Sequence, residues 1–311
     1  MKAITIDFGG TNIKIALFHD GVITKKENIP AYSENGLAPR LYDTEKTLRN
    51  MLAGEDLHNY SGIGIAMPGI VDPINKKVLA LYGKYEDSKQ MDLSTWCHNT
   101  FDLPMVMEMD SKLALLGELN YGCAKGYQDA AMLIFGTGIG TAVSIGGKLL
   151  SSRNYVAGAL SSHIIINMNG RKCTCPNTGC LEASACGWAL EGLIREHPDF
   201  NNSGLAAEEQ LTFKTLSKWC DRNDRTALDV LQHCVISWRA GILNMIHAYD
   251  PAIVILSGGI MNFKGMYDML TEGLQEQVWD CIGTVDIKQA MEPEDSVLYG
   301  LYHLVAETYN N

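Results

Sequence analysis

The 311-residue sequence lacks any apolar run of the ~18–20 residues that a membrane-spanning helix requires. It also lacks an excess of basic residues, since 25 Lys and Arg stand against 36 Asp and Glu. The resulting net charge of −11 argues against binding to the phosphates of nucleic acid. The N-terminus, MKAITIDFGG, lacks the apolar stretch of a signal peptide. We therefore expect a cytoplasmic protein that binds neither membrane nor nucleic acid.

Two common phosphate-binding motifs are absent as well. No segment fits the P-loop pattern G-x4-G-K-[ST], and GTGIGT lacks the G-x-G-x-x-G spacing of dinucleotide-binding folds. The glycines instead form three short turns after apolar segments, which are Gly9–Gly10–Thr11, Gly136–Thr137–Gly138 and Gly258–Gly259. Glycine leaves room for backbone N–H groups to approach phosphate oxygens. One such turn is more simply a strand end, but three predict a polyphosphate site where two halves of the protein meet.

Three of the nine cysteines lie in the stretch CTCPNTGC, ten residues after His163. Disulfides are disfavoured in a reducing compartment, which leaves buried thiols or a metal site as the two interpretations. Three cysteines and one histidine form a standard ligand set for structural zinc. The ligands would be His163, Cys173, Cys175 and Cys180. Because four protein ligands leave no open coordination position, we expect the zinc to be structural.

The order of elements repeats along the chain. AITIDFGGTNIKIALFHDGVI begins at Ala3 and AMLIFGTGIGTAVSIGGKLL begins at Ala131. Each contains a short β-branched strand, a glycine turn, a second apolar strand and a further turn. This predicts two related α/β domains, each opening with a β-hairpin. Apolar spacing also predicts helices after Asp110, at about 226–249 and near 296–309.

Two aspartates are candidates for chemistry. Asp7 ends the first strand, directly before a glycine turn, where a bound magnesium ion would explain a carboxylate beside phosphates. An ordinary turn aspartate is the alternative. Asp110 precedes a helix and is either its N-cap or a general base for a hydroxyl that attacks a γ-phosphate. The residues alone do not decide between these interpretations.

Taken together, these segments resemble the ROK family of sugar kinases and sugar-responsive repressors, within the actin-like sugar-kinase superfamily. DFGGTNIK and FGTGIGT look like its two phosphate motifs, AMPGIVD its sugar-domain strand and LSGGI its adenosine turn. H-x9-C-x-C-x4-C-L-E, from His163 to Glu182, matches its zinc signature. The resemblance implies an α/β fold of two actin-like (ribonuclease H-like) domains, with a ligand cleft between them and a zinc-bound loop. The small domain would comprise residues 1–117 with a C-terminal helix, 294–311, and the large domain residues 118–293.

The resemblance implies an ATP-dependent kinase that phosphorylates a sugar hydroxyl, O6 of a hexose, with Asp110 as the catalytic base. It implies ATP, Mg²⁺ and structural Zn²⁺ as cofactors, and a homodimer or homotetramer. The nucleotide and magnesium elements would be Asp7, Gly9, Gly10, Thr11, Lys14, Gly136, Thr137, Gly138, Gly258 and Gly259. The sugar-binding positions would be Pro68, Gly69, Met109, Asp110, Leu160, His163 and Glu182. The zinc would hold the loop that presents His163 and Glu182 to the sugar.

Two positions depart from the family pattern. Met109 stands where an asparagine precedes the base, and Leu160 where a sugar-binding glutamate is expected. A shift of one residue would place Ala159 at the second position, which is equally unable to hydrogen-bond. A lost hydrogen bond costs about 0.5–1.5 kcal/mol net and ~1–3 kcal/mol if the sugar hydroxyl stays buried. Two losses would weaken a plain hexose by roughly 10- to 10⁴-fold. We therefore expect glucose to be a poor substrate and an acylamino sugar or a glycoside to fit better.

A sugar sensor without catalysis is the alternative function. Only six residues precede Asp7, so we expect no DNA-binding module of the repressor type. The intact Asp7, Asp110 and glycine turns favour the kinase, because a sensor has no physical need for a base and all the phosphate turns. Met109 and Leu160 favour the sensor.

Overall fold

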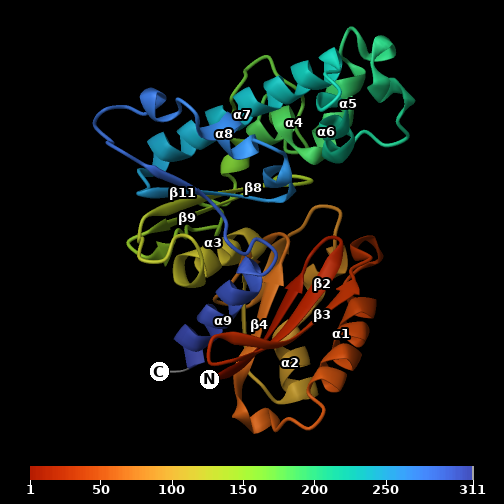
Figure 1. The fold of residues 1–311 in the computed structure, drawn as a ribbon. Helices are drawn as coiled ribbons and strands as arrows, with labels where there is room; N and C mark the ends of the chain where they lie inside the picture. The colour runs from red at the N-terminus through yellow and green to blue at the C-terminus, as the bar shows by residue number, and fades with distance from the viewer. Residues whose placement is uncertain (310–311) are drawn as a thin grey trace. The chain divides into compact units, whose positions relative to one another are not determined.

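The computed structural model describes residues 1–309, which divide into two compact units (Figure 1). The first unit comprises Met1–Gly126, Ser151–Ala157 and the C-terminal residues from Met291. The second comprises Tyr127–Leu150 and Gly158–Ala290. The first unit extends beyond residue 117, the limit expected for the small domain, because one helix continues to Tyr121.

The first unit contains a five-stranded sheet in the order β3-β2-β1-β4-β7. Its strands are β1 (Lys2–Phe8), β2 (Asn12–His19), β3 (Val22–Pro30), β4 (Tyr60–Met67) and β7 (Met105–Met109). The first three strands are antiparallel to one another, whereas β1, β4 and β7 run parallel. The parallel strands are buried on both faces, which explains their nearly continuous apolar sequences. The exposed strand β3 forms one edge.

Two helices cover one face of this sheet, and they contact each other through their backbones. They are α3 (Asp110–Tyr121) and α9 (Ser296–Tyr309), while α1 (Ala38–Met51) lies against the other face (Figure 1). A Cβ atom on Gly117 of α3 would lie 2.0 Å from the Ser296 carbonyl oxygen. A Cβ atom on Gly300 of α9 would lie 2.0 Å from the Leu113 carbonyl oxygen. Only glycine therefore allows this helix pair to approach so closely. Helix α2 (Leu93–Phe101) completes the helices of this unit.

The second unit repeats the sheet of the first. Its strand order, β10-β9-β8-β11-β12, has the same sequence of antiparallel and parallel neighbours. The strands are β8 (Ala130–Phe135), β9 (Ile139–Ile145), β10 (Lys148–Leu149), β11 (Ile253–Ser257) and β12 (Asp286–Gln289). The expectation of two related domains that each open with a β-hairpin is thus confirmed.

A long helix, α7 (Arg225–Tyr249), forms the core of the second unit together with its sheet. The fully buried Trp238 of this helix packs against Phe135 of β8, with ring centroids 5.4 Å apart. Shorter helices surround it, which are α4 (Leu181–Ala185), α5 (Gly187–Arg195), α6 (Phe213–Cys220) and α8 (Met266–Thr271). No helix within residues 1–309 is long and apolar enough to cross a membrane.

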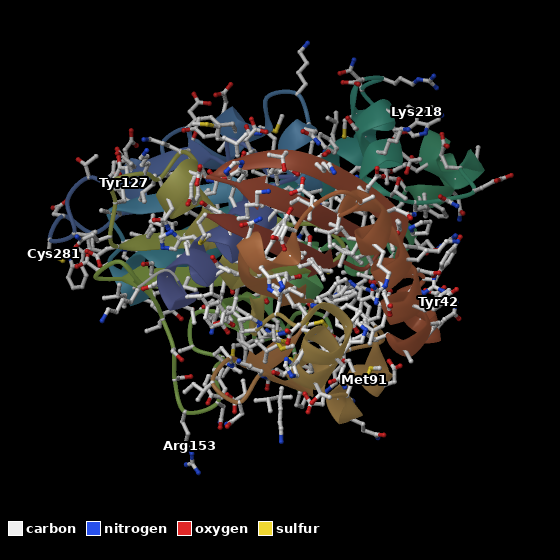
Figure 2. The ribbon with its side chains drawn as sticks, turned by 90° about the horizontal axis from the view of Figure 1, so that it is seen from below. Tyr42, Met91, Tyr127, Arg153, Lys218 and Cys281 are labelled. Atoms are coloured by element: carbon white, nitrogen blue, oxygen red, sulfur yellow. The ribbon has the colours of Figure 1, made fainter. Side chains whose placement is uncertain are left out.

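The segment Ser151–Ala157 belongs to the first unit although the chain on both sides of it belongs to the second. The buried Lys112 of α3 donates a hydrogen bond to the Tyr155 carbonyl oxygen, at 2.9 Å. The Tyr155 hydroxyl also hydrogen-bonds to Asp72, which ends β5 (Ile70–Asp72) of the hairpin formed with β6 (Lys77–Ala80). Arg153, by contrast, projects away from the ribbon into solvent (Figure 2). The segment is therefore fixed at Tyr155.

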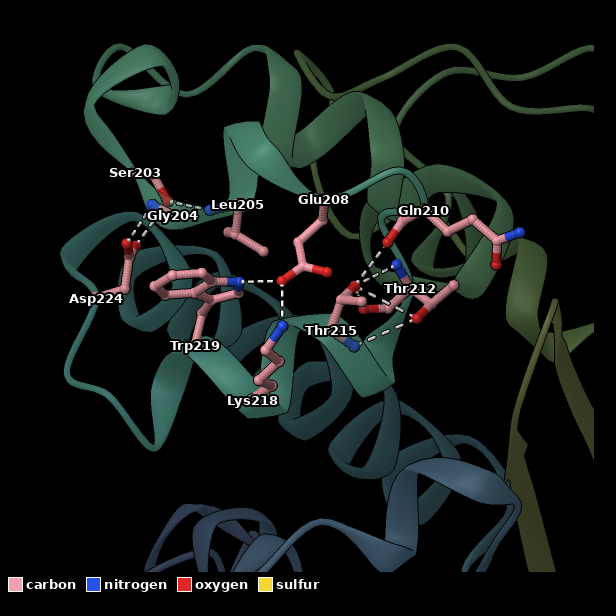
Figure 3. A network of polar contacts seen from close by, with 10 residues as sticks. All are labelled: Ser203, Gly204, Leu205, Glu208, Gln210, Thr212, Thr215, Lys218, Trp219 and Asp224. Atoms are coloured by element: carbon pink, nitrogen blue, oxygen red, sulfur yellow. Dashed lines mark hydrogen bonds and ion pairs between the residues drawn. The ribbon is translucent and has the colours of Figure 1, made fainter.

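The polar stretch at residues 196–210 is a surface excursion that folds back on its own unit (Figure 3). The Glu208 carboxylate accepts hydrogen bonds from Trp219, at 2.8 Å, and from Lys218, at 2.5 Å. Asp224, the N-cap of α7, accepts from Ser203 at 2.8 Å and from the Gly204 backbone at 2.9 Å. These contacts hold the excursion against α6 and the start of α7.

Candidate active site and zinc centre

The carboxyl ends of three parallel strands bring the first unit's candidate residues to one edge of its sheet. In the ladder, Asp7 of β1 is opposite Ala66 of β4, and Met67 of β4 is opposite Met109 of β7. Pro68 and Gly69 follow β4 directly, and Asp110 follows β7. Parallel α/β sheets bind their ligands outside this edge.

Asp110 is the first residue of α3 and not its N-cap. The N-cap position is Met109, and Asp110 accepts one short hydrogen bond, at 2.6 Å, from the Ser111 backbone N–H. The N-cap interpretation therefore does not hold. Burial raises the pKa of the Asp110 carboxyl, and the Ser111 N–H and the nearby charge of Lys84 partly offset this rise. A raised pKa makes the carboxylate a better proton acceptor near neutral pH.

Asp7 is a buried carboxylate without a hydrogen-bond donor. Its exposed fraction is 7%, and no group within residues 1–309 donates a hydrogen bond to its carboxylate oxygens, whereas its backbone carbonyl accepts from the Gly9 N–H at 3.0 Å. Burial and the negative charge of Asp110 raise the pKa of Asp7 to about 7, against a smaller opposing effect of Lys14. An unpartnered carboxylate of this kind fits a hard cation such as Mg²⁺, which binds through oxygen.

The raised pKa of Asp7 predicts a pH dependence of stability. Below its ordinary pKa of 3.8 the Asp7 carboxyl is protonated in both the folded and the unfolded protein. As the pH rises from there to about 7, the unfolded protein loses this proton first, and the folded state loses the stability that the raised pKa provides. At about 1.4 kcal/mol per pKa unit, the loss approaches about 4 kcal/mol above pH 7. The Asp7→Asn variant should therefore gain stability over the wild type between about pH 5 and pH 8. Urea unfolding of both proteins in magnesium-free buffer measures this difference.

Added Mg²⁺ should reduce the advantage of the Asp7→Asn variant, because the cation offsets the burial cost of the charged carboxylate. Glu45→Gln provides the control, since Glu45 lies on the surface helix α1 and its ion pair within residues 1–309 is with Arg49. Parallel pH profiles of the wild type and Asp7→Asn would contradict a buried ionisable Asp7.

The first glycine turn presents two backbone N–H groups without a protein acceptor. The Tyr85 hydroxyl donates to the Gly9 carbonyl oxygen at 2.9 Å, and the Ser33 hydroxyl donates to the Gly10 carbonyl oxygen at 3.0 Å. In a trans peptide the N–H points opposite to the C=O, so the N–H groups of Gly10 and Thr11 point away from these two side chains. Within residues 1–309 neither N–H has an acceptor. The turn is therefore a ready site for an anion.

The second turn uses the same arrangement with different partners. The first N–H groups of α5 donate to it: Gly187 to the Gly136 carbonyl and Trp188 to the Thr137 carbonyl, each at 3.0 Å. The N–H groups of Thr137 and Gly138 are consequently directed away from α5, and no group in the described chain accepts from them.

The third turn packs against the end of β8. Gly258 has φ +95°, and a Cβ atom there would lie 2.1 Å from the Phe135 carbonyl oxygen, so the position requires glycine. Gly259 next to it faces open space. The second and third turns therefore lie close together at one edge of the second unit's sheet.

Two lysines lie near the first turn, and they differ in how their ammonium groups are used. Lys14 donates to the Glu294 carbonyl oxygen at 2.6 Å. Lys84 lies over Gly10, where a Cβ atom would be 2.6 Å from its Nζ. No sequence signal indicates Lys84, because this contact joins a loop to a turn far away in the chain.

The four predicted zinc ligands come together in the second unit. Their ligand atoms all lie within 4.8 Å of one another, with 3.5 Å from Cys173 Sγ to His163 Nδ1 and 3.6 Å from Cys175 Sγ to Cys180 Sγ. A tetrahedron with Zn–S bonds of about 2.3 Å has edges of about 3.8 Å, whereas a disulfide would need about 2.05 Å. The separation thus excludes a disulfide between Cys175 and Cys180 and fits a tetrahedral metal site.

The loop geometry explains how a short sequence forms this cluster. The Cys173 N–H donates to the Asn177 carbonyl at 3.0 Å, which closes the turn that carries Cys175. Gly179 has φ +78°, and a Cβ atom there would collide with the Asn167 carbonyl oxygen at 1.6 Å. Cys180 then begins α4 as its N-cap residue.

Glu182 lies in α4, two residues after the last cysteine. Its carboxylate accepts hydrogen bonds from the Ile139 N–H, at 3.3 Å, and from the Trp188 indole, at 3.2 Å. It therefore borders the second glycine turn, a contact that the sequence did not reveal.

The two positions that depart from the family pattern differ in exposure. Met109 is 6% exposed and Leu160 is 36% exposed, whereas Ala159, the alternative to Leu160, is buried.

The similarity of the chain to known protein families assigns it to one of them. The model of the ROK family matches residues 3–308. The chain belongs to the ROK family. It is 29% identical to a glucokinase of Thermotoga maritima over 99% of this chain and 98% of that protein. It is 23% identical to an N-acetylmannosamine kinase of Pasteurella multocida over 99% and 97%. A xylose repressor of Bacillus subtilis is 28% identical over 66% of this ROK chain and 50% of the repressor.

The expected fold is confirmed by likeness to a solved ROK structure. A ROK glucokinase from Streptomyces griseus, in complex with glucose and AMPPNP, superposes with a TM-score of 0.80 at 23% identity. The alignment covers 99% of this chain and all of that one. This ROK protein therefore has the α/β fold of two actin-like domains.

Proposed function

We propose that this ROK protein is an ATP-dependent sugar kinase that transfers the γ-phosphate to O6 of a hexose derivative. The arrangement of Asp110 and the first glycine turn carries the proposal. Both lie where the parallel strands of one sheet end. The Asp110 carboxylate, whose pKa is raised, is therefore at the same edge of the sheet as a turn with two free N–H groups. A base next to an anion site is what phosphoryl transfer to a hydroxyl requires.

In the proposed reaction, Asp110 accepts the proton of the sugar hydroxyl. The hydroxyl oxygen forms a bond to the γ-phosphorus, and the bond from that phosphorus to the β–γ bridging oxygen breaks, so that ADP leaves with the electron pair. The N–H groups of Gly10 and Thr11 hold phosphate oxygens, and those of Thr137 and Gly138 bind the rest of the nucleotide phosphates. Mg²⁺, held by Asp7 and the phosphates, would neutralise charge on the nucleotide when bound.

The zinc loop has a supporting role in this proposal. His163, Cys173, Cys175 and Cys180 would hold the ion, which leaves no coordination position for substrate. The metal would fix the start of α4, and therefore the carboxylate of Glu182, which we propose as a sugar ligand. The N–H donors from Ile139 and Trp188 orient this carboxylate.

The relatives support a sugar as the acceptor and ATP as the donor. A glucokinase and an N-acetylmannosamine kinase align with this chain over nearly their full lengths. The solved relative bound glucose and AMPPNP, an ATP analogue, in one crystal. A cytoplasmic location agrees with substrates of this kind.

We further propose that the sugar carries an apolar or bulky substituent. Met109 is buried and Leu160 is partly exposed; the leucine cannot hydrogen-bond to a hydroxyl, and the thioether of Met109 is only a weak acceptor. A plain hexose would leave its hydroxyls unpaired at both positions. An N-acylhexosamine or a glycoside would place a methyl or alkyl group against Leu160 instead.

The Leu160→Glu variant tests this choice of sugar. A carboxylate that accepts from a sugar hydroxyl is worth about 1.5–3 kcal/mol, so kcat/KM for glucose should rise by roughly 10- to 100-fold. Activity on an N-acylhexosamine should fall, because its apolar group would meet a charge. ADP release with both sugars measures the change. Leu228→Glu is the matched control, since Leu228 is 39% exposed and lies on α7. High activity of the wild type on glucose would contradict the proposal.

A sugar sensor is the second candidate function. The apolar Met109 and Leu160 favour it, and so does the similarity to the xylose repressor. The deciding experiment measures ADP release with Mg-ATP over plain hexoses, N-acylhexosamines and glycosides. Turnover of one sugar class supports the kinase. Sugars that raise the melting temperature without any turnover support the sensor.

A further inference from the structure

We propose that Lys84 is a catalytic residue whose ammonium group contacts the phosphate group during its transfer. The inference rests on the proposed kinase function and names a group at that site that no sequence motif indicates. Lys84 lies between β6 and the short turn of helix at Glu86–Gln90, in the loop YGKYED.

The position of Lys84 at the first glycine turn is the first observation. Its Nζ and Cε lie 2.6 Å and 2.8 Å from the position of a Cβ atom on Gly10. A Cβ atom is about 2.5 Å from its own backbone nitrogen, so the ammonium is within about 5 Å of the Gly10 N–H. A single phosphate group that accepts from this N–H therefore reaches the ammonium as well.

The second observation is that the ammonium group of Lys84 has no partner among the described residues. Within residues 1–309, Lys84 makes neither a hydrogen bond nor an ion pair, although it is partly buried. The other lysines near this sheet edge are engaged: Lys14 donates to the Glu294 carbonyl and Lys112 donates to the Tyr155 carbonyl. Lys84 is thus the cation near the first turn that remains available to a ligand.

The proximity to the base is the third observation. The positive charge of Lys84, whose ammonium lies over Gly10, lowers the pKa of Asp110, so this cation acts electrostatically on the base as well. The transferred group must lie between the base, which holds the attacking oxygen, and the anion site. A cation that is near both positions is suited to contact that group.

The chemistry explains what the contact would do. The group in transfer carries its charge on three equatorial oxygens, and the protein accelerates the step mainly by position and charge. An ammonium is a compact cation with three donors, which can follow these oxygens from ATP to the sugar. Gly10 leaves the space that the lysine occupies, because any Cβ atom would displace its end.

The test compares Lys84→Met, Lys84→Arg and the surface control Lys46→Met, which removes an exposed lysine of α1. For Lys84→Met we expect kcat to fall by about 100-fold, the usual effect of removing one transition-state donor. Its affinity for AMPPNP should fall by about tenfold while its affinity for ADP stays within about twofold, since only the γ-phosphate meets the ammonium. Lys84→Arg should recover at least about tenfold of the lost kcat. Melting temperatures near that of the wild type establish that the variants are folded.

The outcomes separate this inference from the kinase proposal. If the wild type phosphorylates a sugar and Lys84→Met keeps both kcat and the AMPPNP-to-ADP affinity ratio within about threefold, the role of Lys84 is overturned and the kinase stands. If the wild type binds AMPPNP without turnover, the kinase proposal and the catalytic role of Lys84 are both overturned, whatever the affinity ratio. If the wild type binds no nucleotide, both proposals fail.

Discussion

Replacement of Asp110 by asparagine is expected to lower kcat by about 10³- to 10⁴-fold, because the variant cannot accept the proton of the sugar hydroxyl. Asparagine has nearly the same size, and its side-chain oxygen can still accept the 2.6 Å hydrogen bond from Ser111. The fold and the binding of sugar and nucleotide should therefore persist. Coupled ADP release gives kcat, and a shift in melting temperature on addition of sugar reports binding.

The matched control for this variant is Asp92→Asn. Asp92 is the N-cap of α2 and accepts from the Thr95 N–H at 2.9 Å, a role that asparagine fills equally well. The control should retain full activity. If Asp110→Asn keeps more than about a tenth of the wild-type kcat, another group is the base. A general loss of sugar and nucleotide binding would instead assign Asp110 to structure.

Replacement of Cys173 by serine is expected to remove the zinc and to lower the melting temperature by at least about 10 °C. The binding energy of a structural metal is folding energy, because the unfolded chain has no preformed site. Cys173 and Cys180 are buried beside only a few apolar side chains, so apolar packing contributes little to the loop, which is otherwise held by backbone hydrogen bonds such as the one from Gly179 to the Arg171 carbonyl at 2.8 Å. Metal analysis of the purified protein and a thermal unfolding curve measure both effects.

Cys281→Ser controls for the loss of a thiol, since Cys281 is exposed (Figure 2) and is not one of the four clustered ligands. It should keep one zinc per chain and the wild-type melting temperature. Cys180→Ser should behave like Cys173→Ser, and a chelator should lower the melting temperature of the wild type to that of these variants. A wild-type protein that carries no zinc and is unaffected by Cys173→Ser would contradict the metal site.

The elements that the sequence predicted correctly are those that local pattern determines. The repeated order of strand, glycine turn and strand corresponds to two sheets of equal topology. The histidine and three cysteines meet because a short loop with Gly179 brings them together without help from distant residues. Three helices follow from apolar spacing, which are α3 (Asp110–Tyr121), α7 (Arg225–Tyr249) and α9 (Ser296–Tyr309).

The features that the sequence did not reveal depend on contacts over long sequence separations. The carbonyl groups of Gly9 and Gly10 are held by Tyr85 and Ser33, and these two bonds are what turn the N–H groups outward. Lys84 reaches the same turn from the same loop as Tyr85. Such partners come from tertiary packing, and neither periodicity nor residue spacing carries a signal for them. The roles assigned to the site residues stay predictions until the variants are measured.

The glycine contact between α3 and α9 has a consequence for how the chain is made. The sheet of the first unit is synthesised before the second unit, but α9, which covers it, is synthesised after the second unit. At a translation rate of ~5–20 residues per second, the strands from β1 to β7 remain uncovered for tens of seconds until α9 has been synthesised. The second unit is complete by Ala290 and can fold earlier. The first sheet is therefore without its covering helix throughout the synthesis of the second unit.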